Sequence, residues 1–203
     1  SLPDDISSLS NDEATESLKQ LTGALAAFQS TPAFAPFTSK YDYYLKGQAS
    51  LSASEIRGLA AFVRTDRGNC AACHVIDRNT PNRLPLFTDF SYDNLGLATV
   101  AGDAVDNGLA DTAKVAGELG LSGKFRVPTL RNVALTAPYM HNGVFTTLKE
   151  TVEFYSDRDK NPPVTEFPAT TNRAELGNLG LSSQEVDDIV AFMNTLTDGY
   201  TPK

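Results

Sequence analysis

The chain has 203 residues, of which 41% are hydrophobic, so it is long enough to bury a core as a single domain. No apolar stretch approaches the roughly 18 consecutive residues that a membrane-spanning helix needs, so we expect no membrane span. The net charge of −8 at pH 7 makes nucleic acid and anionic membrane surfaces poor partners. It favours a basic or neutral partner protein, although acidity also simply promotes solubility.

Helix starts are predicted wherever a Ser or Thr lies three residues before a Glu, because these side chains can satisfy each other's free backbone donors in a capping box. In chain order the pairs are Ser10 with Glu13, Ser52 with Glu55, Thr147 with Glu150, and Ser182 with Glu185. The first helix carries Leu18, Leu21, Leu25 and Phe28. The second, read over residues 55–64, has Ile56, Leu59, Ala60 and Val63 on one face.

The segment Cys70-Ala71-Ala72-Cys73-His74 has the C-x-x-C-H order that attaches a haem covalently. Each thiol can add to one haem vinyl group, and the two residues between the cysteines match the distance between the vinyl groups. The His74 imidazole then lies beneath the iron as its proximal ligand. The motif therefore predicts a c-type cytochrome with one covalent haem c.

Two other roles of a C-x-x-C pair fit this sequence less well. A structural zinc needs four Cys or His ligands, and the cysteines and histidines of the chain are Cys70, Cys73, His74 and the distant His141. A thioredoxin-like redox pair expects a βαβ context, whereas residues 55–64 before the motif have helical spacing.

Long irregular segments lie at residues 31–37, 77–90, 96–124 and 161–180. So much loop in one domain would argue against the assignment of helices unless a bound group supplies part of the core, and a large apolar haem can do so. No alternating pattern predicts a strand. The predicted class is mainly α, a cytochrome c-like haem domain with long loops. Residues 1–203 would form one mono-haem domain, with a helical extension over about 10–50 and a haem-binding core over about 51–200.

The last predicted helix follows Ser182. Its apolar residues recur at helical spacing, and they are Val186, Ile189, Val190, Met193 and Leu196. This pattern predicts that one side of the helix packs across the core.

The run KFRVPTLRNVALTAPYMHNG, residues 124–143, resembles the signature of bacterial di-haem cytochrome c peroxidases and their relative MauG. The resemblance extends to residues 24–28, 44–47, 57–60 and 87–96. Nearly the whole chain is thus similar to one half of that family, the C-terminal cytochrome c-like domain that holds the electron-transfer haem. Family members carry two C-x-x-C-H motifs and hold the peroxide-reacting haem in the N-terminal domain, whereas this chain has one motif.

The second axial ligand of the iron is open on spacing alone, with Met140, His141, Met193 and the tyrosines as candidates. Met193 lies on the apolar helix face and suits packing, whereas His141 lies near a turn and suits a hydrogen bond. The resemblance favours Tyr155, which lies fourteen residues after His141, where the peroxidases have a methionine and MauG has a tyrosine. A tyrosine that only packs its ring and hydrogen-bonds its hydroxyl is the alternative.

The resemblance also places residues 126–131 beside the haem, where Arg126 or Arg131 could pair with a propionate. Solvated arginines or a surface ion pair are the alternative. The family further binds calcium through backbone oxygens that match Thr136 and Pro138, with another ligand from the N-terminal domain, and oxygen donors suit calcium.

Three functions remain from the sequence. The first is electron transfer in a peroxidase- or MauG-like redox system, as a free-standing mono-haem protein or as the C-terminal fragment of a di-haem peroxidase. The second is an oxidoreductase whose haem reacts directly with hydrogen peroxide, with His141 as its acid-base group. The third is an inert haem-stabilised interaction domain. We expect a redox partner protein or a second haem domain, and homodimers are common in the family. Because covalent haem is attached outside the bacterial cytoplasm and residues 1–5 lack a signal-peptide pattern, we expect a processed start and a periplasmic location.

Overall fold

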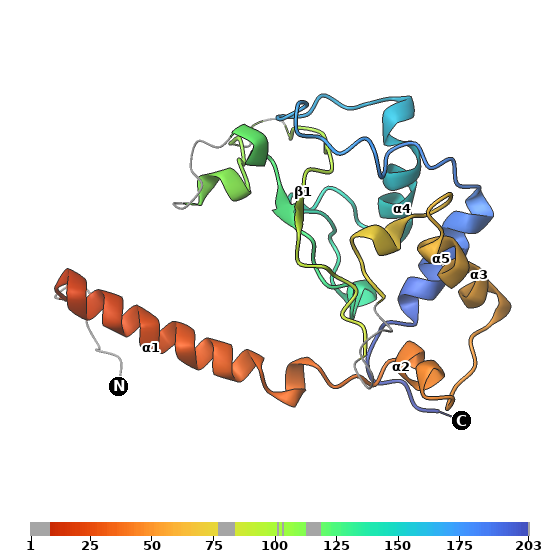
Figure 1. Cartoon of the computed structure of the whole chain (residues 1–203), viewed down its shortest axis with the longest axis horizontal. Helices are drawn as coiled ribbons and strands as arrows, with labels where there is room; N and C mark the ends of the chain where they lie inside the picture. The colour runs from red at the N-terminus through yellow and green to blue at the C-terminus, as the bar shows by residue number, and fades with distance from the viewer. Residues whose placement is uncertain (1–8, 77–83, 101, 103, 113–118, 203) are drawn as a thin grey trace. The chain divides into compact units, whose positions relative to one another are not determined.

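The structure is a computed structural model that describes residues 9–76, 84–100, 102, 104–112 and 119–202. The α-helices are α1 (Asn11–Gln29), α2 (Lys40–Leu45), α3 (Ala53–Val63), α4 (Leu148–Asp157) and α5 (Ser183–Asn194) (Figure 1). Short 3-10 helices are η1 (Pro32–Phe34), η2 (Cys70–Ala72), η3 (Leu109–Asp111), η4 (Leu119–Leu121), η5 (Val133–Leu135) and η6 (Arg158–Lys160). Strands β1 (Tyr92–Asp93) and β2 (Phe125–Arg126) pair antiparallel. The mainly α prediction is confirmed.

All four predicted capping boxes are present. In α1, α3, α4 and α5 the Ser or Thr side chain accepts from the backbone of the Glu three residues later, and that Glu accepts in return. A fifth box begins α2, where Ser39 pairs with Asp42 instead of a Glu. The helix starts are therefore set by local side-chain hydrogen bonds that the sequence displays.

Backbone contacts divide the chain into two units, residues 1–37 and 38–203. The first contains α1, of which no residue is buried, and η1, whose Phe34 ring lies 4.8 Å from the ring of Phe28. The boundary differs from the predicted end of the extension near residue 50. The reason is α2, because its Tyr41 is fully buried in the core of the second unit.

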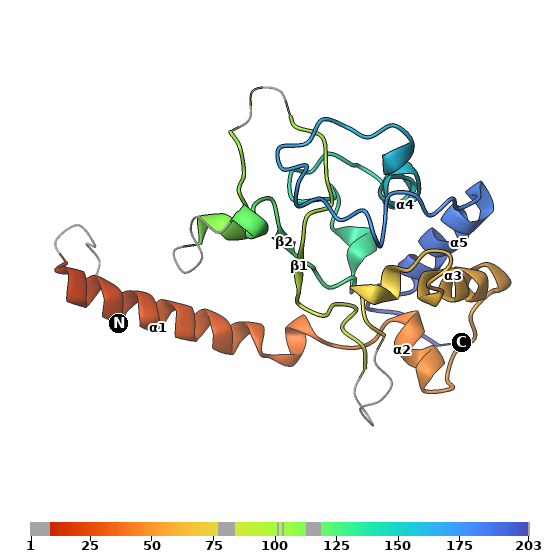
Figure 2. The same cartoon turned by 45° about the horizontal axis from the view of Figure 1, so that its top comes forward.

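The core of the second unit forms where α5 packs against α3 and α4, and Figures 1 and 2 both show α3 beside α5. Its centre is an aromatic cluster with ring centroids 5.2 to 6.4 Å apart, made of Tyr41, Phe62, Phe87 and Phe192. The predicted apolar face of α5 is buried or partly buried throughout. The prediction that this helix packs across the core is confirmed.

Helix α3 is confirmed, but the side that it buries is not the predicted apolar face. Ile56 is 49% exposed and Val63 is 44% exposed, whereas Gly58, Ala61 and Phe62 are buried. A Cβ atom at Gly58 would overlap the backbone carbonyl of Asp188 in α5. The missing side chain therefore allows α3 and α5 to approach closely, and their packing selects the buried side.

The predicted irregular segments contain only short elements where they are described, and their residues 77–83, 101, 103 and 113–118 lie outside the described residues. Strands β1 and β2 left no signal in the sequence because they have two residues each, too few for an alternating pattern. Within the described part of the chain, no helix has both the length and the apolar character needed to cross a membrane.

Candidate haem site

The C-x-x-C-H motif forms one tight turn between α3 and the 84–90 segment. Asn69 adopts a left-handed conformation with φ of 51° and precedes η2. The Cys70 carbonyl then accepts hydrogen bonds from the backbone of Cys73 and, at 2.8 Å, of His74. This winding places both thiols and the imidazole along one wall of a cavity.

The cavity has a volume of about 520 Å³ and lies between the motif, residues 125–130, α4 and α5. Its apolar lining residues include Phe62, Leu95, Val127, Leu130, Val133, Leu148, Val152, Leu176 and Ile189. Cofactor sites are typically apolar hollows of about 300 to 1,000 Å³ with a few placed polar groups. A haem edge attached to Cys70 and Cys73 would extend into this hollow, so the residues present fit the group.

Neither thiol is activated as a nucleophile. Burial raises the pKa of Cys70 to about 12. Burial also raises the pKa of Cys73 to about 11, with help from the negative charges of Glu175 and Asp93. A reactive cysteine needs a depressed pKa, so this environment disfavours the redox alternative. A thioether needs no charge on sulfur.

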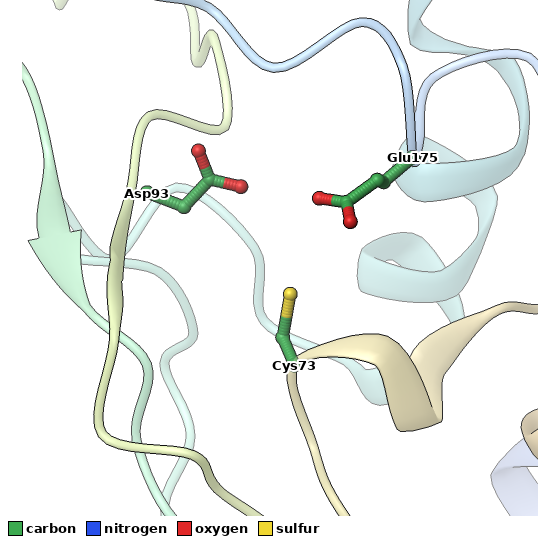
Figure 3. Close-up of side chains that lie close together, drawn as sticks. All are labelled: Cys73, Asp93 and Glu175. Carbon is green, nitrogen blue, oxygen red and sulfur yellow. The ribbon is translucent and has the colours of Figure 1, made fainter.

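A small acidic cluster adjoins Cys73 at one edge of the cavity. The Sγ atom of Cys73 and carboxylate oxygens of Asp93 and Glu175 lie within 4.8 Å of one another, and the sulfur points toward the two carboxylates (Figure 3). The side-chain amide of Asn172 donates to both carboxylates, at 2.5 Å and 2.7 Å. If Cys73 bonds to a haem, its sulfur is no longer free to bind a metal ion. The cluster then offers an ion only the two carboxylates, which already share the Asn172 amide as hydrogen-bond donor.

The His74 ring is held in one orientation by a backbone carbonyl. Its Nδ1 atom lies 2.9 Å from the carbonyl oxygen of Phe87, an acceptor that fixes the ring proton on Nδ1 and leaves Nε2 free to bind a metal. Burial lowers the pKa of His74 and outweighs the opposing effect of the hydrogen bond to the Phe87 backbone. The imidazole is therefore held neutral, the form that coordinates iron.

The candidates Met140, His141, Tyr155 and Met193 for the second axial ligand line the same cavity. Met193 also belongs to the buried core, and the ring of His141 stacks on Phe125 at 3.7 Å with planes 7° apart. The structure thus brings the candidates together, and the choice among them stays a prediction.

Tyr155 reaches the cavity from α4, together with Val152 one turn earlier and Leu148 two turns earlier. Among the residues that the structure describes, none hydrogen-bonds the Tyr155 hydroxyl. Burial raises the pKa of this phenol, with smaller contributions from Cys70 and Cys73. A nearby metal ion reverses such a shift, because its positive charge stabilises the phenolate.

The two arginines of the predicted propionate site lie in different environments. Arg126 lines the cavity, with its guanidinium carbon 4.8 Å from the centroid of the Phe90 ring. Arg131 is 8% exposed and donates to both carboxylate oxygens of Asp42, at 3.0 Å and 2.9 Å. Sequence reasoning missed Asp42, since nothing local links two residues 89 positions apart. A propionate contact of either arginine stays a prediction, and Arg126 is the better placed.

The residues of the predicted calcium site also border the cavity. Thr136 and Pro138 are both lining residues, and the Thr136 hydroxyl donates to the carbonyl of Val133 at 3.1 Å. That bond involves the Thr136 side chain, whereas the predicted calcium site would use the backbone oxygens of Thr136 and Pro138. Calcium binding there therefore stays a prediction.

Comparison with protein families matches residues 66–197 to the model of cytochrome c, a span that contains the motif, α4 and α5. The chain belongs to the cytochrome c family. Covalently bound haem c is the cofactor that this family implies.

Curated relatives and a solved structure refine this placement. The chain is 36% identical to the methylamine utilization protein MauG of Paracoccus denitrificans over 86% of its own length and 50% of the relative. It is 32% identical to the cytochrome-c peroxidase IdrP1 of a Pseudomonas species, covering 86% of this chain and 48% of the relative. The diheme peroxidase BthA of Burkholderia thailandensis superimposes with a TM-score of 0.76 at 33% identity, covering 92% of this cytochrome c chain and 53% of BthA. The predicted resemblance is confirmed, and the chain spans about half the length of these relatives.

Proposed function

We propose that this cytochrome c chain carries one haem, bound by thioether bonds from Cys70 and Cys73 with His74 as proximal iron ligand, and that it transfers electrons in a MauG- or peroxidase-like redox system. The observation that carries the proposal is the shared cavity, because both thiols, the free imidazole nitrogen and an apolar hollow of about 520 Å³ meet in one place. When bound, the haem supplies an iron that accepts and releases one electron.

The chain's own residues then have separate tasks. Cys70 and Cys73 fix the edge of the macrocycle, and the Phe87 carbonyl keeps the His74 proton on Nδ1. Apolar side chains of α4 and α5 exclude water from the metal and keep the local dielectric constant low. Arg126 lies at the cavity wall, where it can compensate propionate charge.

Attachment is tested by the intact mass of protein produced in a host that matures c-type cytochromes. The mass should exceed that of the polypeptide by one haem, and the Cys70→Ala and Cys73→Ala variants should each keep at most one thioether bond. The matched control is Ala71→Ser, which changes the motif between the cysteines without removing a sulfur. Protein of bare polypeptide mass from the same host would contradict the proposal.

We propose Tyr155 as the second axial ligand. The proposal is supported by its place on the cavity-facing side of α4 and by its hydroxyl, which makes no hydrogen bond to another described residue. Phenolate oxygen is a hard anionic donor, so it favours ferric iron and lowers the reduction potential relative to a methionine ligand.

The test compares Tyr155→Phe with Tyr139→Phe. Both tyrosines line the cavity, but the Tyr139 hydroxyl donates to the Val133 carbonyl at 3.0 Å and so has a structural role of its own. Tyr155→Phe should change the ferric optical spectrum and raise the midpoint potential, whereas Tyr139→Phe should leave the spectrum as it is. An unchanged spectrum in Tyr155→Phe would reject tyrosine ligation and return the choice to Met140, His141 or Met193.

Direct reaction with hydrogen peroxide is the second candidate function, favoured by one observation. The His141 side chain is exposed yet lines the cavity, so an acid-base group lies where a small oxidant could enter. Mixing the ferric protein with peroxide distinguishes the functions. A six-coordinate electron carrier should leave the optical spectrum unchanged, whereas a rapid spectral change that is lost in His141→Ala would establish the enzyme.

The wider setting is also proposed. A second haem domain, as in the diheme peroxidase that the chain resembles, or a separate redox protein would exchange electrons with this haem. A periplasmic location follows from the covalent haem, and fractionation of the native host tests it. Sedimentation of the haem-loaded chain tests whether it forms a homodimer.

A further inference from the structure

We propose that the buried ion pair between Asp42 and Arg131 positions the proximal imidazole, by fixing residues 85–88 so that the Phe87 carbonyl holds His74. The inference rests on the proposed role of His74 as an iron ligand. It makes Asp42 and Arg131 positioning residues for the haem, although neither is among the residues that line the cavity.

The ion pair is fully bonded on the Asp42 side. Asp42 is completely buried, and its Oδ2 atom accepts from the Ser39 backbone at 3.0 Å and from the Ser39 hydroxyl at 2.7 Å. Arg131 adds two parallel hydrogen bonds, at 3.0 Å to Oδ2 and 2.9 Å to Oδ1. Burial raises the pKa of Asp42, but Arg131 and Ser39 outweigh it and hold the pKa below its usual value. A charged pair that is saturated in this way is a rigid anchor.

Arg131 also restrains the 85–88 segment through its own contacts. Its Nε atom donates to the Pro85 carbonyl at 2.8 Å, and its guanidinium carbon lies 6.0 Å from the centroid of the Phe87 ring. The next carbonyl, that of Leu86, accepts from the Thr129 hydroxyl at 2.5 Å. The third, that of Phe87, faces Nδ1 of His74 at 2.9 Å. Three consecutive carbonyls are therefore engaged, two by residues 129–131 and one by the proximal histidine.

The far end of the segment is held as well. The Thr88 hydroxyl donates to the Val127 carbonyl at 2.7 Å and accepts from the Phe90 backbone at 2.9 Å. Hydrogen bonds on both sides of Phe87 leave its carbonyl little freedom to turn away from His74.

Phe87 needs such support because of its backbone conformation. Its φ is 54°, a left-handed value that is unfavourable for a bulky side chain. The ring is fully buried between Tyr41, Phe62 and Phe192, and Arg131 lies over it. A strained conformation persists only where its surroundings over-determine it, so loss of the Arg131 bonds should let the Phe87 peptide relax.

Such relaxation would change how strongly His74 binds the iron. A hydrogen bond from Nδ1 to a carbonyl raises the basicity of the histidine ligand, which stabilises ferric iron. A longer or misdirected bond should therefore raise the midpoint potential and change the ligand field of the ferric state.

Arg131→Lys tests the inference, since lysine keeps the positive charge but cannot bind both Asp42 oxygens and the Pro85 carbonyl in a planar fork. We expect a positive shift of the midpoint potential and altered ferric EPR g-values. The control is Arg57→Lys, because Arg57 also binds a buried carboxylate through two bonds, to Asp188 at 2.7 Å and 2.9 Å, without contacting residues 85–88. This control should change stability but not potential.

Thr129→Val keeps the test decisive if Arg131→Lys does not fold. It removes the bond to the Leu86 carbonyl and the bond that the Thr129 hydroxyl accepts from the Arg131 backbone at 3.1 Å, but it keeps the Arg131 side chain, so we expect a smaller positive shift. Intact mass is measured first for every variant, so absence of haem in the parent counts against the proposed function alone. Haem-loaded variants with the parent potential and g-values would overturn the positioning role and leave haem binding intact.

Discussion

Replacing Gly58 with Ala should destabilise the haem-binding unit, although Ala is the better helix former. In an exposed helix the exchange gains about 1 kcal/mol. At position 58 the new Cβ meets the backbone carbonyl of Asp188 and lies 2.9 Å from Cβ of Phe192. Overpacking of a filled core costs about 1 to 3 kcal/mol, and the upper end applies because backbone atoms cannot rotate away.

The expected net loss is therefore about 2 kcal/mol, which for a domain of this size corresponds to a fall in Tm of about 4 to 8 °C. Urea unfolding of the haem-loaded protein, followed by Soret absorbance and far-UV circular dichroism, measures the loss. Gly23 is the matched control, because it lies in α1 and a Cβ atom added there would meet nothing within 4 Å, so Gly23→Ala should keep or raise helicity. A Gly58→Ala midpoint equal to or above that of the parent would refute the close-packing argument.

Three further outcomes are expected. Arg57 and neighbouring hydrogen bonds lower the pKa of Asp188 to about 2, so the stability that this carboxylate contributes is complete above about pH 4 and lost as the pH falls through about 2. Urea midpoints between pH 5 and 2 should therefore depend less on pH in Asp188→Asn, and an unaltered acid profile would contradict this. Thr147→Ala removes the N-cap of α4 and should lower the free energy of unfolding by about 1 kcal/mol in the same assay. An unchanged free energy of unfolding would mean that the capping box does not stabilise the protein. Removing calcium with EGTA should lower the Tm of the haem-loaded protein if the Thr136 and Pro138 carbonyls bind it, and a Tm indifferent to both EGTA and added calcium would argue against that site.

Helix starts were predictable because their signal is local. Each Ser or Thr with a Glu three residues later forms a capping box in the structure. The box that begins α2 was missed, since Asp42 takes the place of Glu and a helix of six residues shows no periodicity. The same Asp42 then serves Arg131, a partner 89 residues away that no local pattern connects to it.

The buried side of α3 was beyond prediction for a different reason. Periodicity counts apolar side chains, and Ile56 and Val63 suggest a face that proves exposed. The structure instead buries Gly58, whose contribution is the absence of a side chain at the crossing with α5. A hydrophobic pattern shows which side chains can contribute to a core, but it does not show how closely two helix backbones can approach each other.

The choice of axial ligand depends on a local sequence motif and on the packing of helices. The motif identifies His74 by itself, whereas Met140, His141, Tyr155 and Met193 all reach the cavity and are equal on spacing. The rotation of α4 decides whether Tyr155 faces inward, because successive residues of a helix are turned by about 100°. Leu148 and Val152 lie on the same side of α4 and are buried in the core, so their packing holds that rotation. Leu148, Val152 and Tyr155 recur at helical spacing, so the sequence indicates that the phenol lies on the core-facing side but leaves open whether it binds the iron.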